Sequence, residues 1–167
     1  MFNEVHSIHG HTLLLITKPS LQATALLQHL KQSLAITGKL HNIQRSLDDI
    51  SSGSIILLDM MEADKKLIGY IGIKAVIDEG YITNIAVFPE FRRRGVAKAL
   101  LNKVFEFAKE KGLSFVSLEV RPSNTEAISL YEKTGFKEEG RRKNFYRLPL
   151  EDALIMTKRF SYENIGD

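Results

Sequence analysis

The stretch that decides how this 167-residue chain is read is Phe91-Arg92-Arg93-Arg94-Gly95-Val96-Ala97-Lys98-Ala99-Leu100-Leu101. It follows the apolar run 82–88 and leads into apolar residues at helical spacing, so it predicts a strand, a basic turn and the start of a helix. The first N–H groups of a helix lack intrahelical partners and favour anions, phosphate above all. Gly95 lets a ligand approach the backbone closely, and the three arginines add positive charge. The stretch therefore predicts a phosphate-binding turn, with an ordinary basic helix start as the alternative.

The pattern of residues 92–97 is Arg-x-x-Gly-x-Ala. It lacks the Lys-Ser/Thr pair of the nucleotide P-loop and the three glycines of the dinucleotide-binding turn. It resembles the coenzyme A pyrophosphate loop of the GCN5-related N-acetyltransferases (GNAT), which lies between a strand and a helix. The resemblance implies that the coenzyme is bound by Arg92, Arg93, Arg94, Gly95, Val96 and Ala97.

Four elements of the second half resemble one branch of that family in order and spacing. Besides the loop they are Ser-Leu-Glu-Val-Arg at 117–121, Ser-Asn-x-x-Ala-x-x-Leu-Tyr-x-x-x-Gly-Phe at 123–136, and Arg-Arg-Lys-Asn-Phe-Tyr at 141–146 with Glu-Asp-Ala-Leu-Ile-Met at 151–156. The branch is the RimI type, which acetylates the N-terminal alanine of a small-subunit ribosomal protein. The resemblance covers residues 82–157, whereas the first 80 residues match only in outline.

Size and composition suit one domain over residues 1–167, with 44% hydrophobic and 26% charged residues. No apolar run approaches the length of a membrane-spanning helix, and the start of the chain does not resemble a signal peptide. The absence of cysteine excludes thiol catalysis and is compatible with the predicted cytoplasmic location. Residues 1–11 predict a disordered polar tail, although His6, His9 and His11 could instead bind a metal.

Positive charge is concentrated after the loop. Residues 91–147 hold fourteen Lys and Arg against seven Asp and Glu, within a net charge of +3 for the chain. Such a face could attract phosphate-bearing ligands, acidic peptides or nucleic acid, or could be solvated surface. A nucleic-acid role is disfavoured because the aromatic residues fall mostly at core spacings and leave no stacking surface.

Hydrophobic periodicity predicts seven strands and four helices. The predicted strands are 12–17, 55–58, 67–77, 81–88, 113–120, 136–142 and 153–160, and the predicted helices are 20–37, 40–50, 96–111 and 124–134. Glu126 is placed for a capping box on Ser123, and Gly112 ends the third helix. The sequence and its resemblance together predict a mixed, mostly antiparallel seven-stranded GNAT sheet flanked by about four helices.

Acetyl transfer from a thioester to an amine needs a base for the ammonium proton and a proton for the departing thiolate. No histidine follows His41, so Glu119 in the apolar strand 115–120 is the best base of this half. A carboxylate is weakly matched to an α-amine, so burial or an intervening water would have to help. The alternative is an outward strand carboxylate paired with Arg121 or another neighbour.

Tyr131 lies one helical turn after Ala127, on the face that packs inward. The resemblance implies that Tyr131 protonates the coenzyme A thiolate, whereas the alternative is a core tyrosine bonded to a backbone carbonyl. Asn124 suits a helix start, and the resemblance implies that it also binds coenzyme A.

Strand residues Ile85, Ala86 and Val87 are expected to pair their backbone with the pantetheine chain, with a bulge there opening the cleft. The resemblance also implies a peptide-facing loop with Arg141, Asn144 and Tyr146 as acceptor-binding residues. Phe145 departs from the family, which usually has a second tyrosine at that position. An edge hairpin with solvated basic residues is the alternative.

These residues predict an acetyl-CoA-dependent N-acetyltransferase without a metal, in which the amine attacks the thioester directly. The expected acceptor is a protein N-terminal alanine, and a small amine or a lysine side chain is the alternative because one fold hosts many acceptors. Residues 21–50 differ from the ribosomal branch, which leaves the acceptor more open than the reaction. A coenzyme A-binding regulatory module without turnover is the competing class.

Overall fold

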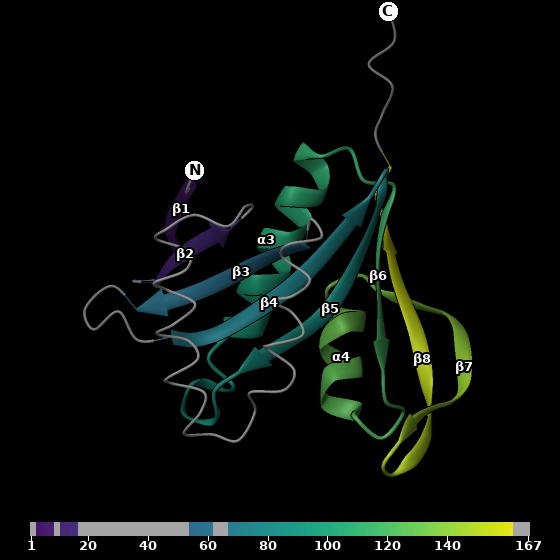
Figure 1. The fold of residues 1–167 in the computed structure, drawn as a ribbon. Coiled ribbons are helices and arrows are strands. Elements are labelled where there is room, and N and C mark those ends of the chain that lie inside the picture. The colour runs from purple at the N-terminus through teal and green to yellow at the C-terminus, as the bar shows by residue number, and fades with distance from the viewer. Residues whose placement is uncertain (1–2, 9–10, 17–53, 62–66, 162–167) are drawn as a thin grey trace, which may run out of the picture. The chain divides into compact units, whose positions relative to one another are not determined.

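Eight strands and two α-helices make up the described part of the chain in a computed structural model (Figure 1). The structure describes residues 3–8, 11–16, 54–61 and 67–161, with side chains from residue 68 onward. The two helices predicted at 20–37 and 40–50 lie outside the described residues. Hydrogen bonds link the strands in the order β1-β2-β3-β4-β5-β6-β8-β7. The sheet is mixed and mostly antiparallel, as predicted, since β5 and β6 are the parallel pair among those whose register is defined.

The chain divides into two compact units, of which the first comprises residues 1–75 and 83–104. Its strands are β1 (Asn3–Ile8), β2 (His11–Ile16), β3 (Ser54–Met61) and β4 (Leu67–Val76), followed by the later part of β5 (Glu79–Val87). Successive strands from β1 to β4 pair antiparallel, which confirms the pairing predicted between the first two strands of the meander, 55–58 and 67–77.

Strand β1 is the eighth strand, where seven were predicted. It occupies most of the segment predicted as a disordered tail, and Asn3, Glu4 and Val5 pair with Leu15, Leu14 and Leu13 of β2. The prediction was wrong for residues 3–8 because an edge strand is held by backbone hydrogen bonds, which require no apolar alternation in its sequence.

Helix α3 (Val96–Glu110) confirms the helix predicted after the basic turn. In the first unit its buried face comprises Val96, Leu100, Leu101 and Val104. Gly112 ends the helix at a φ of +67°, and its N–H donates to the Lys109 carbonyl at 3.1 Å. A short 3-10 helix, η1 (Pro89–Phe91), connects β5 to this region and was not predicted.

The second unit comprises residues 76–82 and 105–167. It contains β6 (Phe115–Val120), α4 (Thr125–Lys133), β7 (Lys137–Arg147) and β8 (Leu150–Arg159). Strand β8 lies between β6 and β7 and is antiparallel to both. The buried residues of this unit include Val116, Leu118, Val120, Tyr131, Phe136, Ala153, Leu154 and Met156. The parallel pairing of β5 with β6 joins Glu79, Gly80 and Tyr81 to Phe115, Val116 and Ser117.

Among the described residues, no helix is long and apolar enough to cross a membrane.

Candidate functional site

The basic loop of the first unit runs from the end of β5 into α3. Arg93 has a φ of +62° and Gly95 a φ of +83°, so the chain makes two left-handed steps before the helix begins at Val96. The Ala99 N–H donates to the Gly95 carbonyl at 2.9 Å, which makes it the first intrahelical bond of α3. The preceding amide groups therefore face the loop, as the prediction of an anion-binding turn requires.

Arg92 and Arg94 both contact neighbouring residues of the loop. The Arg92 Nε donates to the Val87 carbonyl at 3.2 Å, and the Arg94 guanidinium lies 5.6 Å from the centre of the buried Phe91 ring. Residues Arg92 to Gly95 are exposed. A Cβ added at Gly95 would meet no atom within 4 Å, so the space at this position is open to a ligand.

Ile85, Ala86 and Val87 are half-buried at the end of β5. Sequence reasoning missed the residue that lets this strand pack closely, Gly69 of β4. A Cβ at Gly69 would lie 2.9 Å from the Ala86 carbonyl oxygen and 3.1 Å from Val96. A glycine inside a predicted strand is the signal that could have identified it. The predicted bulge in β5 stays a prediction.

Glu119 is exposed on β6, between the buried Leu118 and Val120. Its Oε1 lies 3.5 Å from Nη1 of Arg142 on β7. The carboxylate therefore points outward and has a cationic partner, although this partner is Arg142 and not the adjacent Arg121. This position suits both the proposed base and the outward structural carboxylate.

Tyr131 is 5% exposed on α4, which confirms that it lies on the inward face. Burial raises the pKa of its phenol to about 12, and the nearby Tyr146 contributes to the rise. Its ring centre lies 5.7 Å from that of Phe136 in the core of the second unit. A phenol in this environment keeps its proton throughout the neutral range and can act as a donor.

Asn124 is the N-cap of α4, and its Oδ1 accepts a hydrogen bond from the Ala127 N–H at 3.3 Å. The predicted capping box on Ser123 is therefore wrong. The Ser123 N–H and Oγ donate instead to the two carboxylate oxygens of Glu151, at 2.7 and 2.9 Å. The cap moved by one residue because a strand distant in sequence supplied a stronger, charged acceptor for Ser123.

The segment predicted to face the acceptor is part of β7, which continues to Arg147. Its pairing with β8 is irregular between Arg142 and Tyr146, and Asn144 in between has a φ of +54°. The Arg141 Nε donates to Glu138 at 2.8 Å. Phe145 is 44% exposed, whereas Tyr146 is half-buried.

Tyr146 belongs to the same unit as Glu119 and Tyr131. Burial raises the pKa of its phenol, and the neighbouring Arg121 opposes the rise while Glu119 and Glu151 add to it. The second unit contains Glu119, Asn124, Tyr131 and Tyr146, whereas Ile85 to Val87 and Arg92 to Ala97 belong to the first unit.

Within the described part of the chain, no group of three or more His, Asp or Glu side chains is placed to hold a metal ion. The side chains of His6, His9 and His11 lie outside that part, so the metal-binding alternative stays a prediction.

Two features stand out. In the first unit a basic turn leads into helix α3, and the second unit contains both a strand carboxylate, Glu119, and a buried phenol, Tyr131. The chain belongs to the Acetyltransferase (GNAT) family, whose model matches residues 24–136. Its fold is therefore the GNAT fold that the resemblance implied.

Two curated relatives match different shares of the chain. The CsgBAC operon transcriptional regulatory protein of Escherichia coli is 97% identical over 70 residues, which are 42% of this chain and 32% of that protein. The [ribosomal protein bS18]-alanine N-acetyltransferase of Salmonella typhimurium is 40% identical over 98 residues, which are 58% of this chain and 66% of that enzyme. The chain thus spans about a third of the regulator and slightly less than two thirds of the acetyltransferase.

Among solved structures, the ribosomal-protein-S18-alanine N-acetyltransferase from Escherichia coli is similar with a TM-score of 0.65 and 25% identity. The alignment covers 93% of this chain and 99% of that structure.

Proposed function

We propose that this chain transfers the acetyl group of acetyl-CoA to the α-amine of a protein N-terminus, with alanine as the first residue. The observation that carries the proposal is the placement in one unit of an exposed carboxylate, Glu119, and a buried phenol, Tyr131, whose pKa is about 12. Membership of the acetyltransferase family and 40% identity to a ribosomal-protein-alanine N-acetyltransferase support the same reaction.

The basic loop is the proposed site for the pyrophosphate of coenzyme A. The first amide groups of α3 would donate to the phosphate oxygens, and the exposed arginines 92–94 would add positive charge. The backbone of Ile85 to Val87 would pair with the pantetheine chain, and Asn124 would bind the coenzyme in addition to capping α4.

Acetyl transfer then proceeds without a covalent enzyme intermediate. Glu119 takes a proton from the acceptor ammonium, directly or through a water, and the neutral amine attacks the carbonyl carbon of the thioester. The C–S bond breaks, and the Tyr131 phenol donates a hydrogen bond and then its proton to the departing thiolate. The nitrogen releases its second proton as the amide forms, and solvent returns a proton to the phenolate. Because a phenol of pKa about 12 is a weak acid, a strong hydrogen bond is the main stabilisation that it supplies before transfer is complete.

The decisive experiment measures thiol release from acetyl-CoA with a panel of acceptors. The panel contains a peptide beginning with alanine, a lysine peptide with a blocked N-terminus, polyamines and aminoglycosides. Turnover confined to the alanine peptide supports the proposal, and turnover confined to a small amine or to lysine keeps the reaction while changing the acceptor.

A second candidate function rests on the 97% identity to a transcriptional regulatory protein over 70 residues. The matched stretch is 42% of this chain, and the acetyltransferase motifs lie between residues 82 and 157. The second candidate supposes that the regulator-like stretch lies before those motifs, where 81 residues are available. The chain would then join a regulator-like N-terminal part to an acetyltransferase-like C-terminal part.

If the chain is composite in this way, the identity of the acceptor is the part of the proposed function that changes first. Residues 21–50, which differ from the ribosomal branch, would carry regulator-like sequence, although the family model itself begins to match at residue 24. The second candidate is therefore a regulatory protein that binds coenzyme A without turning it over. Calorimetric binding of acetyl-CoA combined with no thiol release for any acceptor would favour it, whereas turnover of the alanine peptide would exclude it.

A further inference from the structure

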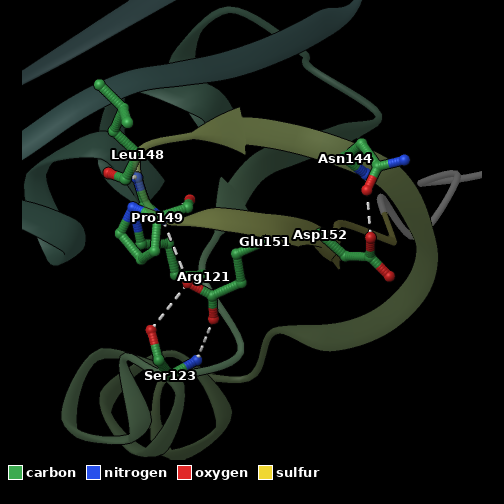
Figure 2. A network of polar contacts seen from close by, with 7 residues as sticks. All are labelled: Arg121, Ser123, Asn144, Leu148, Pro149, Glu151 and Asp152. Carbon is green, nitrogen blue, oxygen red and sulfur yellow. Dashed lines mark hydrogen bonds and ion pairs between the residues drawn. The ribbon is translucent and has the colours of Figure 1, made fainter.

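The guanidinium of Arg121 holds together several parts of the second unit (Figure 2). Arg121 directly follows β6, and its Nη1 lies 3.1 Å from Glu151 Oε2 and 3.3 Å from the Pro149 carbonyl oxygen. Its Nη2 donates to the Leu148 carbonyl at 3.2 Å. The guanidinium carbon also lies 3.9 Å from the centre of the Tyr146 ring. One side chain thus binds both sides of the β7–β8 turn and the aromatic face of Tyr146.

Glu151 extends this attachment to the start of α4. Its two carboxylate oxygens accept hydrogen bonds from the Ser123 N–H and Oγ, next to the helix cap Asn124. These bonds lower the pKa of Glu151, with the backbone bond from Ser123 as the largest cause and Arg121 adding to it. The carboxylate therefore connects β8, the end of β6 and the N-terminal end of α4.

The next residue, Asp152, secures a different part of the same hairpin. Its Oδ1 accepts a hydrogen bond from the Asn144 N–H at 2.9 Å, within the irregular part of β7 (Figure 2). Successive residues of a strand point to opposite sides, so adjacent acids can hold two separate segments. Asp152 and Arg121 therefore hold the segment that contains Tyr146 at its two ends, Asn144 and Leu148.

We propose that Arg121 and Glu151 are positioning residues for acetyl transfer, which attach the β7–β8 hairpin to the start of α4. The inference rests on the proposed acetyl transfer and adds residues to its site. Arg142 of the same hairpin lies 3.5 Å from Glu119, and Asn124, the cap of α4, directly follows Ser123. A shift of the hairpin therefore changes the surroundings of both the proposed base and the proposed coenzyme-binding cap.

The geometry requires arginine at this position. Its fork of donors reaches three acceptors while its flat face stacks on a ring, whereas lysine offers one compact charge. A matched control lies on the same two strands: Arg159 of β8 binds Glu139 of β7 through two bonds of 2.7 and 2.9 Å. That pair is another arginine–carboxylate contact between β7 and β8, but Arg159 is the last residue of β8, at the opposite end of the strand from Glu151.

The test compares wild type, Arg121→Lys, Glu151→Gln and the control Glu139→Gln. We expect kcat for the alanine peptide to fall about tenfold or more in Arg121→Lys and Glu151→Gln, because a misplaced reactive group is costly to the rate. KM for that peptide should rise, and Glu139→Gln should match wild type. Retained kcat and KM in Arg121→Lys and Glu151→Gln, or an equal loss in Glu139→Gln, would overturn the proposal.

Amide hydrogen exchange separates a failure of this inference from a failure of the proposed function. In Glu151→Gln we expect faster exchange at Ser123 and across residues 144–148 than in wild type, while Glu139→Gln leaves both unchanged. If wild type turns over no acceptor, the proposed function fails, and unchanged exchange in Glu151→Gln would separately show that the attachment is not made. Melting temperatures of all variants identify any that do not fold.

Discussion

Arg142 on β7 reaches across β8 to Glu119 on β6, with 3.5 Å between Nη1 and Oε1. On the strand between them, Ala153 pairs with Arg142 and Ile155 pairs with Glu119. The Arg142 and Glu119 side chains are partly exposed, at 58% and 33%, so the pair contributes at most about 1 kcal/mol to stability. Its importance lies in placing a positive charge beside the carboxylate proposed as the base.

Replacing Arg142 by glutamine should lower KM for a cationic acceptor about two- to fivefold, because the guanidinium repels an ammonium group that approaches Glu119. Arg142→Lys keeps the charge and serves as the control. The measurement is KM for the alanine peptide at low and high salt, with a smaller salt effect in Arg142→Gln. A rise in KM would instead identify Arg142 as a group that binds the acceptor.

Glu119→Gln should reduce kcat by about 10²-fold or more at neutral pH, since the amide cannot take the ammonium proton. KM for acetyl-CoA should not change. The deficit should shrink above about pH 8, where an α-amine is increasingly neutral by itself. Glu132→Gln, an exposed carboxylate on α4, is the control and should match wild type. If the loss of kcat in Glu119→Gln were the same at every pH, Glu119 would not be the base.

The pKa of Tyr131 predicts the alkaline side of the rate profile. Since burial raises this pKa to about 12, the phenol keeps its proton while the acceptor amine loses its own near pH 8. The rate should therefore rise through pH 8 and stay level to about pH 10. Tyr131→Phe should lower the plateau without moving the rise. A fall in the wild-type rate between pH 8 and 10 that disappears in Tyr131→Phe would contradict this assignment.

The same shift makes stability depend on alkaline pH. The folded protein holds the Tyr131 proton more tightly than the unfolded chain, in which the pKa is about 10. The resulting stabilisation is complete below about pH 10 and is lost as pH rises towards the folded value of about 12. Melting temperatures between pH 9 and 12 should fall less steeply in Tyr131→Phe than in wild type, and parallel curves would count against the shift.

Gly95 and Gly112 form a matched pair at the two ends of α3. Both have positive φ, +83° and +67°, and a Cβ at either position meets no atom within 4 Å. Alanine at either position should cost about 1 kcal/mol of unfolding free energy through backbone strain alone. Only Gly95→Ala should also weaken coenzyme A binding, measured by calorimetry. Equal affinities of the two variants for coenzyme A would show that the basic loop does not bind it.

Local patterns were sufficient where one segment determines its own structure. The apolar spacing after Val96 predicted α3, and Gly112 predicted its end, because a helix buries one face and a left-handed terminal residue favours glycine. The spacing from Ala127 to Tyr131 likewise predicted that the tyrosine is buried. The motifs in residues 82–157 were enough to predict the family.

The partners of charged side chains were decided only by the tertiary structure. The sequence suggested Arg121 as a neighbour for Glu119 and Ser123 as a helix cap, but Glu151 binds both Arg121 and Ser123, and Glu119 pairs with Arg142. Such choices depend on strand register, which brings residues 23 to 30 positions apart into contact. A local pattern determines which side chains lie on a face, whereas the packing of distant strands determines which of them meet.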